Sequence, residues 1–179
     1  MARRVAPLVC VLAAVVTVAA LLPAGASAKG MRQSTALAID KGVLTQLNQI
    51  RAAHHLVPLS LSPSLSAAAT QHSRDMVARG YFAHNSSNGL PFWKRIQGFY
   101  PQGGFGYWSV GENLFWTLGT ATSAQSMNAW MASPDHRANI LDPAWRQIGI
   151  STVSSADAPG AYGNHDVTVI TTDFGVRHG

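Results

Sequence analysis

Residues 130–141 read Trp130-Met131-Ala132-Ser133-Pro134-Asp135-His136-Arg137-Ala138-Asn139-Ile140-Leu141. Within this stretch, Ser133-Pro134-Asp135 is typical of a helix start, because serine can cap the helix and proline fits its first position. It predicts a short helical turn that runs through Ile140. The residues just before it, 120–131, carry apolar side chains at helical spacing and predict a separate helix.

After this stretch the period of the apolar residues changes from that of a helix to that of a strand. Ile148, Ile150 and Val153 predict one strand, and Val167 to Ile170 predict another. The residues between them, 154–164, are rich in turn formers and are expected to link the two strands.

Before residue 130 the sequence is mainly helical in pattern, with three predicted helices. One runs from about Leu37 to His54-His55, one from Pro63, with Ser62 as its cap, to Gly80, and a short one covers residues 91–99. Residues 100–111 are rich in glycine and aromatic residues and are expected to form an irregular packed loop. Helices first and strands late indicate an α+β domain with helices on a small antiparallel sheet.

Several side chains are predicted to lie in the core. In the second helix these form one stripe: Leu65, Ala68, Ala69, His72 and Met76. The short third helix is expected to turn Trp93, Ile96 and Phe99 inward. Phe82 and Trp130 are also expected to be buried, and His72 is interpreted as a hydrogen-bonded core histidine.

The composition of the chain restricts its class. The 179 residues, of which 47% are apolar, fit one domain with a real core. No repeat of 20–50 residues occurs, which argues against solenoids and propellers. The 13 basic residues are dispersed along the chain rather than clustered, so we expect no specific nucleic-acid partner.

The N-terminus has the pattern of a secretory signal peptide. Arg3 and Arg4 precede an apolar run from Val5 to Leu22, and small residues follow up to Ala28. We predict a signal peptide at residues 1–28, an N-terminal arm and helix start at 29–42, and the folded domain at 43–176. The alternative, a membrane anchor, is disfavoured because the apolar run is short for a bilayer span and helix breakers follow it.

Removal of residues 1–28 would take away Cys10 and lower the formal charge from +5 to +3. A secreted domain without cysteine has no disulfides, no zinc ribbon and no cysteine nucleophile. We expect an extracellular protein, without a stable membrane anchor, that is a monomer.

Three residues stand out as candidate chemistry: His84, Glu112 and His136. His84 follows the glycine that ends a helix, Glu112 lies at the edge of the glycine-rich segment, and His136 is in the first turn of a helix. Two imidazoles and one carboxylate could hold a divalent ion with positions left open for water. The alternative, three unrelated polar loop residues, stays open on spacing alone.

Short segments spread along the chain provide a further indication. They occur in this order: Leu47-Asn48-Gln49-Ile50-Arg51, residues 61–69, His72-Ser73, Gly80-Tyr81-Phe82-Ala83-His84, Gly111-Glu112-Asn113-Leu114, residues 130–141, Ile148-Gly149-Ile150 and Thr172-Asp173-Phe174-Gly175. Together they resemble the bacterial, secreted branch of the CAP superfamily (cysteine-rich secretory proteins, antigen 5 and pathogenesis-related proteins), also called the SCP domain. The resemblance covers roughly residues 43–175.

The resemblance implies an α-β-α sandwich and a cleft lined by two histidines and two glutamates, in which the histidines can hold a divalent ion, with zinc as the expected metal. His84, Glu112 and His136 match three of these positions. The second glutamate position holds Ser133 in this sequence. We also assign Asn113 to the cleft.

The sequence leaves three functions open, because one fold hosts several activities. The first is a secreted binding module that holds a divalent ion or a polar ligand, small or polymeric, in this cleft. The second is a metal-assisted hydrolase of peptide, nucleic acid or cell-wall polymer with Glu112 as the catalytic base. The loss of the second glutamate leaves enzymatic activity undecided. The third, lipid or sterol binding, is known for some relatives of the family.

Overall fold

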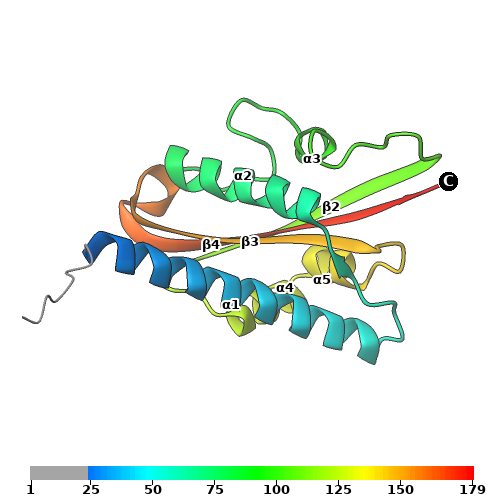
Figure 1. The fold of residues 1–179 in the computed structure, drawn as a ribbon, viewed down its shortest axis with the longest axis horizontal. Helices are drawn as coiled ribbons and strands as arrows, with labels where there is room; N and C mark the ends of the chain where they lie inside the picture. Colours follow the sequence, from blue (N-terminus) through cyan, green and yellow to red (C-terminus); the bar gives the residue numbers. More distant parts are fainter. Residues whose placement is uncertain (1–23) are drawn as a thin grey trace, which may run out of the picture.

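The computed structural model of the chain describes residues 24–179. Its elements are α1 (Ala24–Ala53), β1 (Ser60–Leu61), α2 (Pro63–Arg79), α3 (Phe92–Gln97), β2 (Tyr107–Leu118), α4 (Ser123–Ala132), α5 (Pro134–Leu141), β3 (Gln147–Ala158), a 3-10 turn (Gly160–Tyr162) and β4 (His165–His178). The sheet lies between two helical layers, with α2 and α3 on one face and α1, α4 and α5 on the other (Figure 1). The predicted α-β-α sandwich is therefore confirmed.

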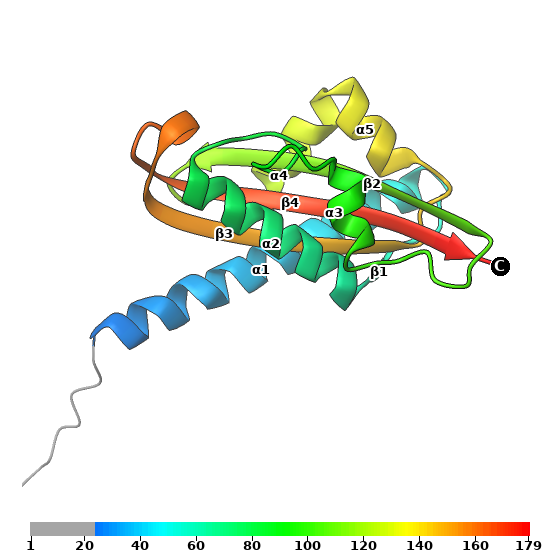
Figure 2. The ribbon, with the colours of Figure 1, turned by 90° about the horizontal axis from the view of Figure 1, so that it is seen from above.

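The sheet has four strands in the order β1-β3-β4-β2. The two predicted strands, β3 and β4, pair antiparallel, as expected, and β2, which was not predicted, also pairs antiparallel with β4. The two-residue β1 pairs parallel with β3. β4 is central, and its residues 167–176 are all buried, whereas β2 forms one edge of the sheet. Figure 2 shows α5 beside this β2 edge and α2 across β3 and β4.

The predicted second helix has the bounds and ends that its sequence indicated. The Ser62 hydroxyl accepts a hydrogen bond from the Leu65 N–H, and Gly80 ends the helix in the left-handed conformation. The predicted stripe is buried, including His72. The helix lies so close to the sheet that a Cβ at Gly149 would collide with the backbone of Leu65 and Ser66. A glycine in β3 and small residues on α2 therefore set the separation of the two layers.

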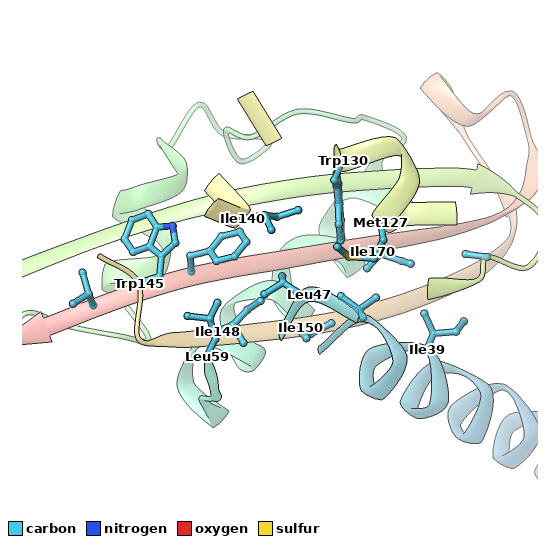
Figure 3. Close-up of a cluster of buried hydrophobic side chains, with 14 residues drawn as sticks. Ile39, Leu47, Leu59, Met127, Trp130, Ile140, Trp145, Ile148, Ile150 and Ile170 are labelled. Carbon is cyan, nitrogen blue, oxygen red and sulfur yellow. The ribbon is translucent and has the colours of Figure 1, made fainter. Parts of the chain in front are cut away.

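The opposite layer covers a large apolar cluster, shown in Figure 3. α1 contributes Ile39, Val43 and Leu47, and α4 contributes Met127 and Trp130. Trp130 is 1% exposed, and its indole N–H donates to the Leu114 carbonyl of β2 at 2.9 Å. The predicted burial of Trp130 is confirmed, and its bond fixes α4 to the edge strand.

The first helix is longer than predicted. Residues 29–36, which we expected to form a polar arm, belong to α1, and Leu37 is exposed on it. The segment has no proline and most of its residues have good helix propensity, so the helix runs through it despite Gly30. The predicted signal peptide lies almost entirely outside the described residues and stays a prediction.

Three further expectations are wrong. Residues 107–111 are not loop but the start of β2, because they pair with the C-terminal end of β4. β3 also runs on to Ala158, into the expected linker. Trp93 and Phe99 are exposed rather than inward, since α3 has fewer than two turns and presents Ile96 and Arg95 to the interior, and Phe82, in the loop after α2, is exposed as well.

Candidate functional site

The loop after α2 places His84. Where the chain leaves α2, the Gly80 carbonyl accepts from the Ala161 N–H at 2.8 Å. The Tyr81 carbonyl accepts from the Tyr162 hydroxyl at 2.9 Å, and His72 Nε2 donates to the Ala83 carbonyl at 2.9 Å. The backbone up to His84 is thus tied to the β3–β4 connection and to α2.

Glu112 lies in the middle of β2 on the face covered by α2 and α3, where it is 4% exposed. Its Oε1 accepts from His84 Nδ1 at 2.8 Å, and its Oε2 is paired with the Arg95 guanidinium of α3. Arg95 also donates to the His84 carbonyl at 2.9 Å. The predicted pair His84 and Glu112 therefore meet, and Arg95 contacts both.

This arrangement fixes the state of the His84 ring. Burial and the positive charge of Arg95 lower the pKa of His84, so the ring is neutral near pH 7. Because Nδ1 donates its proton to Glu112, the lone pair of the neutral ring is on Nε2. The side chain is 50% exposed, so this nitrogen is available to a ligand.

His136 is held at the site through its backbone. Its carbonyl accepts from the Asn113 side-chain amide at 3.0 Å, and Asn113 Oδ1 accepts from Asn139 Nδ2 at 2.9 Å. The Asn139 amide also donates to the Glu112 carbonyl at 3.1 Å. Asn113 is fully buried, so its role is to join the first turn of α5 to the β2 edge.

The His136 ring is half-buried and lies near enough to His84 to feel its charge. Burial, followed by the charge of His84, lowers the pKa of His136. Ser133 occupies the cap position of α5, as predicted from its Ser-Pro sequence. Its hydroxyl, however, makes no capping hydrogen bond to any residue between 24 and 179.

A second carboxyl group, Asp173, lies next to Glu112. The two residues are directly paired across β4 and β2, so their side chains point to the same face of the sheet. Asp173 is completely buried, and within residues 24–179 no N–H or O–H group donates to either of its carboxyl oxygens. Burial and the neighbouring Glu112 raise the pKa of Asp173 well above its ordinary value.

Sequence reasoning gave no role to Arg95 or Asp173. Arg95 is one of many dispersed basic residues and carried no signal. Asp173 did carry a signal, which was not used. It is a charged residue within the apolar pattern of a strand, and a buried charge needs a partner.

Arg95 also lines a cavity of about 840 Å³ between α2, α3 and the loop that joins them. Arg74, Arg79 and Lys94 line it as well, with Asp75 as the acidic member. Arg79 is paired with Asp75 at 2.6 Å. Arg74 and Lys94 therefore give this cavity a positive rim.

The site provides a limited set of ligands for a metal. Among the residues described, no three His, Cys, Asp or Glu side chains converge on one point that could hold an ion. Both oxygens of Glu112 are already occupied by His84 and Arg95. The donors that fit an ion are therefore the two neutral imidazoles, and other positions would be filled by water or by a ligand.

Comparison with known proteins decides the family. The model of the Cysteine-rich secretory protein family, CAP, matches residues 44–171. The chain belongs to the CAP family. Its site residues His84, Glu112 and His136 all lie inside the matched region, as does Asn113.

The CAP chain has relatives among bacterial proteins. It is 36% identical over 123 residues to the uncharacterized protein YkwD of Bacillus subtilis (strain 168), which is 68% of this chain and 45% of that protein. An extracellular SCP-domain protein from Bacillus anthracis has the same fold, with a TM-score of 0.59, 22% identity, and coverage of 87% of this chain and 44% of that one. An outer surface protein of Borrelia burgdorferi has a TM-score of 0.59 at 20% identity, over 76% and 91% of the two chains. The chain thus spans less than half the length of YkwD and of the Bacillus anthracis protein.

Within residues 24–179, no helix has both the length and the apolar character that a membrane crossing requires.

Proposed function

We propose that this CAP domain is a secreted binding module in which His84 and His136 hold a divalent ion, with zinc as the expected metal. The observation that carries the proposal is the bond from His84 Nδ1 to the buried Glu112 carboxylate, which presents Nε2 to a ligand. Histidines that bind metals commonly donate their other ring N–H to a carboxylate in this way. Zinc bound there would offer its remaining coordination positions to a polar ligand or to water.

Secretion is proposed from two observations. The first 28 residues have the pattern of a signal peptide. Two structural relatives are described as an extracellular protein and an outer surface protein. An ion site on such a domain would serve ligands outside the cell.

The position of Glu112 favours an orienting role over a catalytic one. It is 4% exposed, and each of its oxygens already accepts from His84 or Arg95, so it is poorly placed to take a proton from a water molecule. The binding function therefore has more support than metal-assisted hydrolysis.

Calorimetric titration with zinc tests the proposal. Wild type is compared with the double variant His84→Ala/His136→Ala, which should lose specific binding. The matched control is His54→Ala/His55→Ala, which removes two exposed histidines at the end of α1 and should bind as wild type does. Glu112→Gln should bind about 10–100-fold more weakly, as expected for a carboxylate that orients a metal-binding histidine. Equal affinity of wild type and the His84/His136 variant would refute the site.

A further inference from the structure

Basic residues that are dispersed in the sequence meet at one cavity on the face of the sheet opposite α1 (Figure 1). The cavity, of about 840 Å³, lies between α2, α3 and the loop 80–91 that joins them, and its volume is typical of pockets that hold small ligands. His84, Glu112 and His136 do not line it, so it is separate from the proposed metal site. The basic residues that line it are Arg74, Arg79, Lys94 and Arg95.

Two of these four positive charges are balanced by carboxylates. Asp75, the acidic residue of the lining, is paired with Arg79 at 2.6 Å. Arg95 is paired with the buried Glu112 of β2. His72 also lines the cavity, but it adds no charge at neutral pH, because burial lowers its pKa to about 3. The charge of the cavity therefore depends on the other two basic residues.

Arg74 and Lys94 supply an excess of positive charge. Both side chains are exposed, and neither forms an ion pair with a carboxylate within residues 24–179. The Lys94 ammonium lies 5.4 Å from the centre of the Trp93 ring, a contact that leaves its charge in place. Guanidinium and ammonium groups bind carboxylates and phosphates through charge-assisted hydrogen bonds. The cavity therefore fits an anionic ligand.

The loop that forms one wall of the cavity is held in place by Asp75. Its Oδ2 accepts from the Tyr81 hydroxyl at 2.7 Å and from the Ser87 hydroxyl at 2.9 Å. Within the loop, the Ser86 N–H donates to the Leu90 carbonyl at 2.9 Å. The wall is thus formed without a ligand, which lowers the entropic cost of binding one.

The rest of the lining combines an aromatic ring with hydrogen-bonding side chains. Phe99 is 36% exposed and lines the cavity beside α3. Side-chain amides and hydroxyls line it as well, from Gln71, Ser86, Ser87 and Asn88. A sugar ring has a C–H face that packs on an aromatic ring and hydroxyl groups that bond to amides and hydroxyls. An inorganic anion or an acidic peptide would use the charges but not this combination.

We propose that the cavity between α2 and α3 binds an anionic saccharide. Arg74 and Lys94 bind its carboxylate or phosphate group, the sugar ring packs on Phe99, and the polar side chains of α2 and the loop bind its hydroxyl groups. This site goes beyond the proposed zinc site and does not depend on a metal.

Calorimetric titration of the protein tests the proposal. The probes are trigalacturonic acid, which carries carboxylates, mannose 6-phosphate, which carries a phosphate, and neutral galactotriose. We expect a charged sugar to bind about 10-fold or more tightly than galactotriose, and the one that binds identifies the anion. Salt at about 0.5 M should weaken this binding, because it screens exposed charges.

Three variants locate the binding in the cavity. Arg74→Ala/Lys94→Ala should bind the charged sugar about 10-fold or more weakly than wild type. The matched control is Arg32→Ala/Lys41→Ala, which removes the same charge from exposed positions of α1 and should bind as wild type does. Phe99→Ala keeps every charge and should bind the sugar about fivefold more weakly. All of these side chains are exposed, so the variants are expected to fold.

The variant His84→Ala/His136→Ala should bind the charged sugar as wild type does, so the two proposals can fail independently. Three results would overturn the saccharide site. The first is no binding of either charged sugar. The second is equal affinity of wild type and the Arg74/Lys94 variant. The third is equally tight binding of a short polyglutamate or a short single-stranded DNA, which would show that the cavity selects charge alone.

Discussion

The two histidines of the site are held in different ways. The ring of His84 is bonded to a buried carboxylate, which is itself bonded to Arg95, so the ring has a fixed orientation and tautomer. His136 is fixed through its carbonyl by Asn113, and no hydrogen bond from its ring is seen within residues 24–179. The His84 half of the site is therefore held by side-chain bonds, and the His136 half by a bond to its backbone.

Among the single substitutions considered, the largest loss of stability is expected at Glu112, which holds the His84 ring. Glu112→Ala would leave Arg95 as a buried charge without its partner. Removal of one member of a buried pair costs about 3–5 kcal/mol in the free energy of unfolding. Urea denaturation measures this loss. His84→Ala is the control on the same bond: its ring is half exposed, so its loss should stay below about 1 kcal/mol. Equal losses would show that Glu112 and Arg95 do not form a buried ionic pair.

The features that could be predicted from the sequence are those that depend on neighbouring residues in the chain. His84, Glu112 and His136 were found from short local segments, and the ends of α2 were given by Ser62-Pro63 and Gly80, which act locally. β2 was missed altogether: residues 107–111 were expected to be loop and no strand was predicted at 112–118, because these residues form a strand only through pairing with β4. Strand preference depends on such tertiary neighbours more than helix preference does.

The supporting residues of the site were missed for a related reason. Arg95 meets Glu112 only because α3 packs on the same face of the sheet as His84, and no local pattern in residues 91–99 indicates that contact. Asp173 meets Glu112 through strand register, which depends on how β2 and β4 align over their full length. Contacts between distant segments supplied what local reasoning could not.

The next largest loss of stability is expected at Asn113, which holds His136 through its carbonyl. Asn113→Ala would leave the His136 carbonyl without its donor and would take from the Asn139 amide one of its two acceptors, the other being the Glu112 carbonyl. We expect a loss of about 2–3 kcal/mol in the free energy of unfolding, because unsatisfied buried polar groups are costly. Urea denaturation measures the loss. His84 should keep its ring tautomer in this variant, since its own bonds are untouched.

The matched control is Asn128→Ala, on the exposed face of α4, which should be neutral. A change in the His84 ring of Asn113→Ala would show that the two halves are coupled rather than independent.

A loss of stability of similar size is expected when the pH is lowered. It comes from His72 of α2, which is hydrogen-bonded to the loop that carries His84. Burial and the charge of Arg95 lower the pKa of His72 to about 3. Below pH 6.5 the unfolded chain binds a proton at His72 that the folded chain does not, so stability falls as pH falls. Between pH 7 and pH 5 this contribution is about 2 kcal/mol.

The contribution is measured as a difference between two proteins, because other groups titrate in the same range. His72→Gln keeps a donor for the Ala83 carbonyl but cannot bind the proton. Its loss of stability between pH 7 and pH 5 should be smaller than that of wild type by about 2 kcal/mol. Identical pH dependence in both proteins would contradict the buried, neutral state of His72.

The smallest effects compare two serines with the same local sequence. Ser62-Pro63 begins α2 and Ser133-Pro134 begins α5, yet the Ser62 hydroxyl caps its helix and the Ser133 hydroxyl makes no such bond in the part of the chain described. Ser62→Ala should cost about 1 kcal/mol, as loss of a cap does. Ser133→Ala should change stability by less than about 0.5 kcal/mol. Thermal and urea unfolding of both variants measure these values. Equal costs would mean that Ser133 caps α5 after all, which would leave its hydroxyl unavailable to a ligand beside His136.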